Sequence, residues 1–158
     1  MVEANDPVTM GMLGNHYEHG LRGLQQDHAK AMELYARAAE LGWGNVHSLL
    51  ADNYYEGGDL KKAKFQLEAG AMAGHEVARF NLGNFEVRHG NMEQAVKHWT
   101  VGASAGCYHS MHKLRYSFER GAVSRESMDS TLAAYNVSCA KMRSKARDAF
   151  INAISEIK

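Results

Sequence analysis

Apolar residues recur along the chain at the three- and four-residue spacing of α-helices. The first segment opens with Asp6, a residue type favoured as an N-cap. Pro7 follows, which fits a first helical turn because its missing amide hydrogen is not needed there. Met10, Leu13 and Tyr17 then form an apolar stripe. A second stripe of the same spacing consists of Ala31, Leu34, Tyr35 and Ala38. The two stripes predict a pair of helices that pack through their apolar faces.

The same pattern returns every 32 residues. Three segments, 38–42, 70–74 and 102–106, each begin with two small residues and end in glycine. Leucine keeps the same step at Leu50, Leu82 and Leu114, and alanine keeps it at Ala31, Ala63 and Ala95. A period of this length is typical of stacked helical repeats. The sequence therefore predicts an all-α solenoid of about four antiparallel helix pairs, in which the small residues let neighbouring repeats approach closely.

We expect the whole chain, residues 1–158, to form one domain. Its expected parts are repeats at about 6–42, 43–74, 75–106 and 107–138, and a C-terminal capping helix at 139–158. In the fourth repeat Tyr135 and Ser138 replace an alanine of the pair and the final glycine. The apolar stripe nevertheless continues, either in one helix to about Ile157 or in two helices that break near Ser144. A terminal repeat is expected to be atypical because one of its faces has no neighbour.

Capping residues mark the expected helix ends. Asp27 is placed to cap the second helix of the first repeat, and Asn91 with Gln94 has the spacing of a capping box. Gly42 is placed to end the second helix in the left-handed conformation. The first repeat is five residues longer than the others. We expect these residues in the loop Gly20–Asp27, because exposed loops accommodate insertions at least cost.

The first repeat closely resembles the Sel-one-like repeat (SLR), a relative of the tetratricopeptide repeat. The residues that carry the resemblance are Tyr17, Gly20, Gly23, Leu24, Asp27, Lys30, Ala31, Tyr35, Ala38, Ala39 and Gly42. Leu13-Gly14 and Leu82-Gly83 match the family's helix A signature, and the resemblance covers roughly residues 6–122. The later repeats depart from the motif: they lack the inserted loop, Ala51 replaces the glycine, and Glu86 stands where a tyrosine is usual.

The resemblance implies a right-handed superhelix that serves as a protein-interaction scaffold, with the first helix of each pair on the concave face. Helical spacing then predicts which positions face a partner. These candidate partner-binding residues are Asn15, His19, Asp52, Tyr55, Phe80, Asn84, Val87, Arg88, His112, Tyr116 and Arg120. Asn15, Asp52 and Asn84 share one repeat position, suited to hydrogen-bonding an extended peptide backbone. In the alternative interpretation, Phe80 and Val87 belong to the core between repeats and the polar positions are a solvated face.

Composition narrows the class of partner. Lysine and arginine total 18, as do aspartate and glutamate, so the formal charge is zero. Binding to nucleic acid or to an anionic membrane surface needs clustered positive charge, so neither partner is expected. The start of the chain lacks the features of a signal peptide, and two cysteines do not make a disulfide framework. We therefore expect a cytoplasmic protein without a cofactor, a monomer or weak homodimer whose partner is another protein or an extended peptide.

Two alternatives to the scaffold remain open at the level of sequence. Cys107, His109 and His112 lie close together along the chain, which suggests a small metal-binding or hydrolytic protein. Paired CxxC or HExxH spacing is absent, as is a nucleophile with a base, so we expect neither a metal site nor an enzyme. In the other alternative, a structural fragment self-assembles through its C-terminal helix, at Ile151, Ile154 and Ile157.

Overall fold

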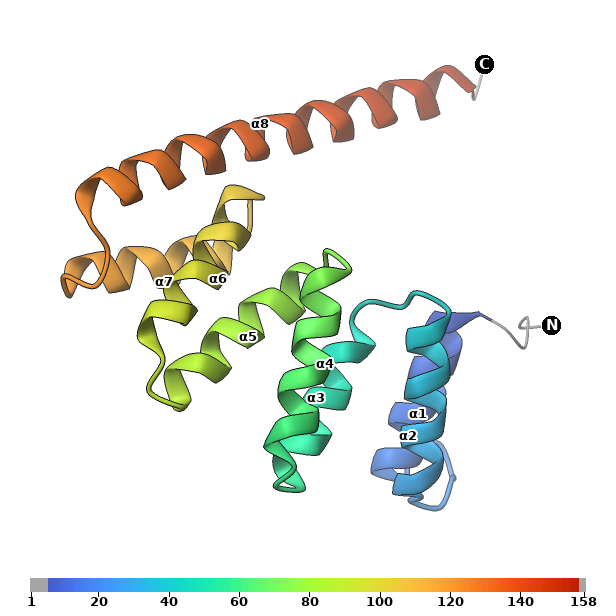
Figure 1. The fold of residues 1–158 in the computed structure, drawn as a ribbon. Helices are drawn as coiled ribbons and strands as arrows, with labels where there is room; N and C mark the ends of the chain where they lie inside the picture. Colours follow the sequence, from blue (N-terminus) through green and yellow to red (C-terminus); the bar gives the residue numbers. More distant parts are fainter. Residues whose placement is uncertain (1–5, 157–158) are drawn as a thin grey trace. The chain divides into compact units, whose positions relative to one another are not determined.

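The computed structural model of the protein describes residues 6–156, which fold into helices joined by short loops (Figure 1). Within this range there are eight helices and no strands. They are α1 (Pro7–His19), α2 (His28–Glu40), α3 (Val46–Glu56), α4 (Leu60–Met72), α5 (Glu76–Arg88), α6 (Met92–Ser104), α7 (Tyr108–Glu119) and α8 (Arg125–Glu156). The predicted all-α fold is confirmed.

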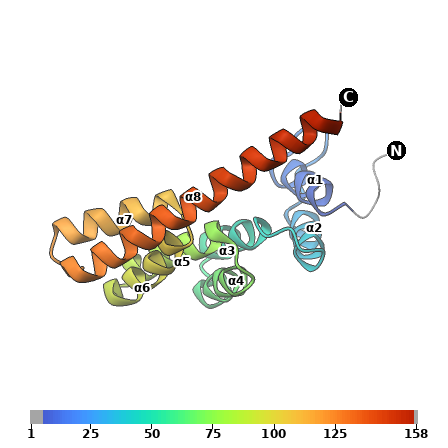
Figure 2. The same ribbon diagram turned by 90° about the horizontal axis from the view of Figure 1, so that it is seen from above.

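The helices group into two compact units, Met1–Leu82 and Gly83–Lys158. Within the first unit, α1 packs against α2, α2 contacts α3, and α3 packs against α4. Both pairs are antiparallel (Figure 1). Within the second unit, α6 packs against α7, and α8 lies beside both; Figure 2 shows α7 and α8 running side by side. The contacts in α1–α4 and in α6–α8 join consecutive helices, as expected for a helical repeat.

The second helix of each of the first three repeats ends in the same hydrogen-bonded turn. Gly42, Gly74 and Gly106 all have positive φ, at 87°, 85° and 96°. The amide after each glycine donates back to the carbonyl five residues earlier: Trp43 to Ala38 (3.0 Å), His75 to Gly70 (2.9 Å) and Cys107 to Gly102 (3.0 Å). This is the Schellman motif, in which glycine supplies the left-handed residue. The left-handed cap predicted at Gly42 is confirmed, and Gly74 and Gly106 repeat it.

The predicted N-caps are confirmed except one. The Asp27 carboxylate accepts the Lys30 amide at 3.0 Å and so caps α2. The capping box at Asn91 is wrong, because the Asn91 side chain makes no capping hydrogen bond. Its amide instead donates to the carboxylate of buried Glu86, at 2.8 Å. Glu86, which departs from the repeat motif, thus binds the Asn91 side chain that was expected to cap α6.

The inserted residues of the first repeat lie in its loop, as predicted. The chain uses residues 20–27 to connect α1 to α2, against 57–59 and 89–91 at the equivalent turns. The loop is fixed to α1 by three hydrogen bonds. They join the Leu21 amide to the His16 carbonyl (2.9 Å), the Asp27 amide to the Tyr17 carbonyl (2.9 Å) and the Gln26 side-chain amide to the Glu18 carbonyl (2.8 Å). These bonds hold the loop against the last turns of α1.

Within each helix pair, small residues on the first helix accommodate bulky residues on the second. A Cβ built on Gly14 would lie 2.7 Å from the Tyr35 ring, and one on Gly83 would overlap the Trp99 indole. Leu50, Leu82 and Leu114 are buried, as their repeat positions predict. Leu13 does not follow them: it is 38% exposed, because α1 turns Gly11 and Gly14 inward instead. The stripe predicted for α1 is therefore correct at Met10 and Tyr17, which pack against the core, but not at Leu13.

Neighbouring repeats approach closely at the small residues of the period. A Cβ on Gly70 would lie 2.6 Å from the Cβ of Ala78, and a Cβ on Gly102 would lie 2.5 Å from the Ser110 hydroxyl. Ala78 and Ser110 are themselves fully buried. A larger side chain at either glycine would separate the helices, which explains why the repeat keeps these positions small.

The C-terminal segment is one helix. α8 runs without a break from Arg125 to Glu156, so the expected boundary between the fourth repeat and the capping helix at 138–139 falls inside it. Its first turns are anchored by buried Met128 and Thr131, and the Ser138 hydroxyl donates to the Ser104 carbonyl at 2.7 Å. Side chains 140–155 are all exposed, including Ile151 and Ile154, whereas Ile157 lies outside the described residues. Within residues 6–156, no helix has the length and apolar character needed to span a membrane.

Candidate partner-binding surface

The eleven predicted partner-binding residues all lie on the first helices of the pairs or directly after them, and none is buried. Three are half-buried: Asn15, Phe80 and Asn84. The exposed ones are His19, Asp52, Tyr55, Val87, Arg88, His112, Tyr116 and Arg120. Val87 is 37% exposed, which argues against placing it in the core between repeats. The exposed character of these positions agrees with a binding role, but which of them contact a partner stays a prediction.

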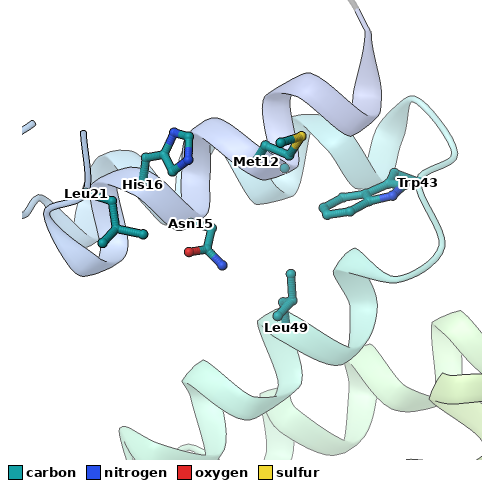
Figure 3. Close-up of a pocket in the computed structure, with 7 residues that line it drawn as sticks. Met12, Asn15, His16, Leu21, Trp43 and Leu49 are labelled. Carbon is teal, nitrogen blue, oxygen red and sulfur yellow. The ribbon is translucent and has the colours of Figure 1, made fainter.

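In the first unit, a pocket of about 280 Å³ lies between α1 and α3. Its lining consists of Gly11, Met12, Asn15, His16, Leu21, Trp43 and Leu49. Figure 3 shows the Asn15 amide and the Leu49 side chain on opposite sides of the space, with Trp43 at one end and Leu21 at the other. The pocket places one predicted residue, Asn15, among apolar side chains that the sequence analysis did not select.

A buried tyrosine joins α2 to α1 in the same unit. Tyr35 is fully buried, and its hydroxyl donates to the Glu18 carboxylate at 2.6 Å. Burial, followed by the hydrogen bond to Glu18, raises the pKa of Tyr35 above its ordinary value. Nearby, the Lys30 ammonium lies 4.4 Å from the centre of the Tyr17 ring. A side-chain hydrogen bond with Tyr17, followed by the charge interaction with it, raises the pKa of Lys30. α1 and α2 are thus joined by polar contacts as well as by packing.

In the second unit, three predicted residues lie along α7 or just after it. The Arg120 guanidinium lies over the Tyr116 ring at 4.2 Å from its centre. His112 stacks on the ring of Tyr108 at 6.3 Å between centres. An exposed tyrosine with a stacked arginine is a residue combination that is common at binding hot spots. Asn84, Val87 and Arg88 belong to the same unit, on α5.

The proposed alignment of Asn15, Asp52 and Asn84 stays a prediction. Asn15 and Asp52 belong to the first unit and Asn84 to the second. Asn84 is half-buried, as is Asn15, whereas Asp52 is exposed. The alternative in which Phe80 is a core residue also stays open, since Phe80 is only half-buried.

Cys107, His109 and His112 do not converge. Cys107 is buried, and its sulfur accepts the Ser110 amide at 3.4 Å as the N-cap of α7. His109 and His112 are exposed. In the part of the chain that the structure describes, no group of three or more histidine, cysteine, aspartate or glutamate residues is placed to hold a metal ion. Cys107 and Cys139 are free thiols; the first is buried and the second half-buried.

Sequence reasoning missed most of the pocket. The candidate partner-binding positions predicted from the sequence do not include Met12, His16, Leu21, Trp43 or Leu49. Part of the signal was present in the sequence: Leu21 lies in the longer loop of the first repeat, and Trp43 occupies a position held by His75 and Cys107 in the next repeats. What the sequence lacks is the spacing between α1 and α3, which decides whether these residues enclose a space.

The comparisons with known proteins support the repeat assignment. The family model of the Sel1 repeat matches residues 7–43, the first helix pair. Among curated proteins, none matches the chain closely enough to count as a relative.

Two solved structures have a similar fold. A Sel1 repeat protein from Oxalobacter formigenes is 22% identical with a TM-score of 0.67, and the match covers 86% of this chain and 60% of that one. A protective antigen of uropathogenic Escherichia coli strains that displays an SLR fold is 21% identical with a TM-score of 0.60; the match covers 85% of this chain and 34% of the antigen. The chain thus spans less than two thirds of either protein, and the likeness shows the fold.

Proposed function

We propose that this chain, a Sel1-repeat protein by its first helix pair and by its fold, is a non-enzymatic scaffold that binds another protein through an extended segment. Sel1 repeats generally mediate protein–protein interactions. One observation carries the proposal for this chain: the positions that keep the 32-residue period are buried at Leu50, Leu82 and Leu114, whereas the candidate partner-binding positions on the same helices are half-buried or exposed. The constant residues build the stack, and the variable residues on its surface are free to differ with the partner.

The α5 helix offers the most direct test. Phe80, Asn84 and Arg88 follow one another at four-residue spacing, so they share one helical face. Changing all three to alanine should leave the circular dichroism spectrum intact while proteins captured from the native lysate by the immobilised chain are lost. Quantitative mass spectrometry of the captured proteins measures the loss.

A matched control lies on α4, the second helix of its pair. Lys61, Phe65 and Glu68 combine a cation, an aromatic ring and a polar group, and all three are exposed, Phe65 by 65%. The triple alanine variant at these positions should retain the captured proteins. If the α4 variant loses them and the α5 variant keeps them, the binding surface is on the opposite side of the helix pairs and the proposal is wrong.

A further inference from the structure

The pocket between α1 and α3 has a composition that selects its occupant. Its side walls are Met12, Leu21, Trp43 and Leu49, and its polar groups come from Asn15 and His16. None of the lining residues is an acid, a lysine or an arginine. An uncharged lining favours an uncharged, apolar occupant, because a charged group would lose its water without gaining a counter-charge.

The size of the pocket limits the occupant further. About 280 Å³ is at or below the lower end of the range for sites that enclose a drug-sized ligand. It suits a single large side chain, such as that of leucine or phenylalanine. The half-buried Asn15 side chain lies at this pocket, and among the described residues its amide has no hydrogen-bond partner. A side-chain amide offers one acceptor and two donors, which match the N–H and C=O of a peptide group.

The pocket is built by features that the later repeats lack. Leu21 comes from the inserted loop, and hydrogen bonds from this loop to α1 hold it in place. The Trp43 ring lies against Gly11, where any Cβ would overlap it, and the positions equivalent to Trp43 hold His75 and Cys107. The wall residues Met12 and Leu21 are both exposed, although they are large and apolar. Covering these exposed apolar walls with an apolar group of a partner is expected to be favourable, because it removes apolar surface from water.

We propose that this pocket binds one large, uncharged apolar side chain of the partner's extended segment, with Asn15 pairing to the adjacent peptide group. The inference rests on the proposed function and deepens it, since it assigns a specificity pocket to the junction of the first two repeats. The partner is thereby required to carry a leucine or an aromatic residue in an extended stretch.

The test uses blocked single amino acids as probes: N-acetyl-leucinamide and N-acetyl-phenylalaninamide, with N-acetyl-lysinamide and N-acetyl-glutamate amide as charged comparisons. Each is titrated into the 15N-labelled chain at millimolar concentrations. The apolar probes should cause saturable shifts of the amide signals of Met12, Asn15, Leu21 and Leu49, and the charged probes should not. Leu21→Asp places a charge in the wall and should weaken apolar binding at least about fivefold.

Leu60→Asp is the matched control, because Leu60 has nearly the same exposure as Leu21 (41% against 45%) and begins α4 in the same unit. It should bind the apolar probes as the unchanged chain does. Shifts that do not saturate, that are equal for charged probes, or that persist in Leu21→Asp overturn the pocket. The α5 triple variant separates the two proposals. If that variant loses the captured proteins but the unchanged chain binds none of the probes, the scaffold stands and the pocket is wrong. If the unchanged chain binds the apolar probes selectively but the α5 variant still captures the same proteins, the scaffold is wrong and the pocket stands.

Discussion

The indole ring of Trp43 lies directly against the backbone of Gly11, so closely that a Cβ at position 11 would overlap the six-membered ring. Gly11 is in α1 and Trp43 is between α2 and α3. The contact therefore ties the first helix of the chain to the segment that leads into the second repeat. The same contact forms a wall of the apolar pocket, so one pair of residues contributes both to packing and to the candidate site.

Gly11→Ala should lower the free energy of unfolding by about 1–3 kcal/mol, because the methyl group must displace the Trp43 ring. Helix propensity alone favours alanine over glycine by about 1 kcal/mol, so the clash has to outweigh a gain. Denaturant unfolding measures the change, and the NMR signal of the Trp43 indole N–H should shift. Gly57→Ala is the control, because a Cβ at this position would lie 3.4 Å from its nearest neighbour. The free energy of unfolding of this variant should equal or exceed that of the unchanged chain. Equal effects at both positions would contradict the assigned contact.

Ala71→Leu should destabilise the stack by about 1–3 kcal/mol, since Ala71 is buried next to the close approach of Gly70 and Ala78. The same change at Ala36, which is exposed on α2, should alter stability by no more than about 0.5 kcal/mol. Thermal unfolding of the two variants measures the difference. A tolerant Ala71 would show that the repeats do not depend on small residues for their spacing.

Tyr35 should make stability depend on pH in the alkaline range. Its pKa is raised in the folded chain by burial and by Glu18, above an ordinary value of 10.0. The unfolded chain therefore loses this proton first as pH rises. The stabilisation is complete below pH 10 and declines as the pH rises above it. Tyr35→Phe should show a smaller loss of unfolding free energy between pH 9 and pH 11 than the unchanged chain.

Tyr35→Phe should also lower the free energy of unfolding near neutral pH. It leaves the Glu18 carboxylate without its 2.6 Å donor, which should cost about 0.5–1.5 kcal/mol at pH 7. Denaturant unfolding at each pH separates the two effects. Parallel pH profiles for the two chains would contradict the assigned pKa shift.

The last turns of α8 should contribute little to stability, because side chains 140–155 are all exposed. Changing Phe150, Ile151 and Ile154 to serine should shift the thermal midpoint only slightly, and amide hydrogen exchange should be faster there than in the anchored first turns. Light scattering should give the same mass for both chains. A fall in mass for the serine variant would favour the alternative in which the chain self-assembles through this helix.

The repeat pattern predicted most of the fold because the period encodes local chemistry. A glycine such as Gly74 marks a left-handed helix end wherever it occurs, and Asp27 needs only the Lys30 amide three residues away. Predictions failed where the outcome depends on distant partners. The side-chain amide of Asn91 donates to buried Glu86 and so does not cap α6. Leu13 lies outside the core because Gly11 and Gly14 face inward, where they contact the rings of Trp43 and Tyr35. The pocket was missed for the same reason, since Leu21 and Leu49 are far apart in sequence.

If the first helices of the repeats bind a partner protein, hydrogen exchange of the chain with and without a captured partner should show it. Bound partner should slow exchange on α1, α3, α5 and α7, at the turns that carry Asn15, Asp52, Asn84 and Tyr116. Protection confined to α2, α4 and α6 would contradict it.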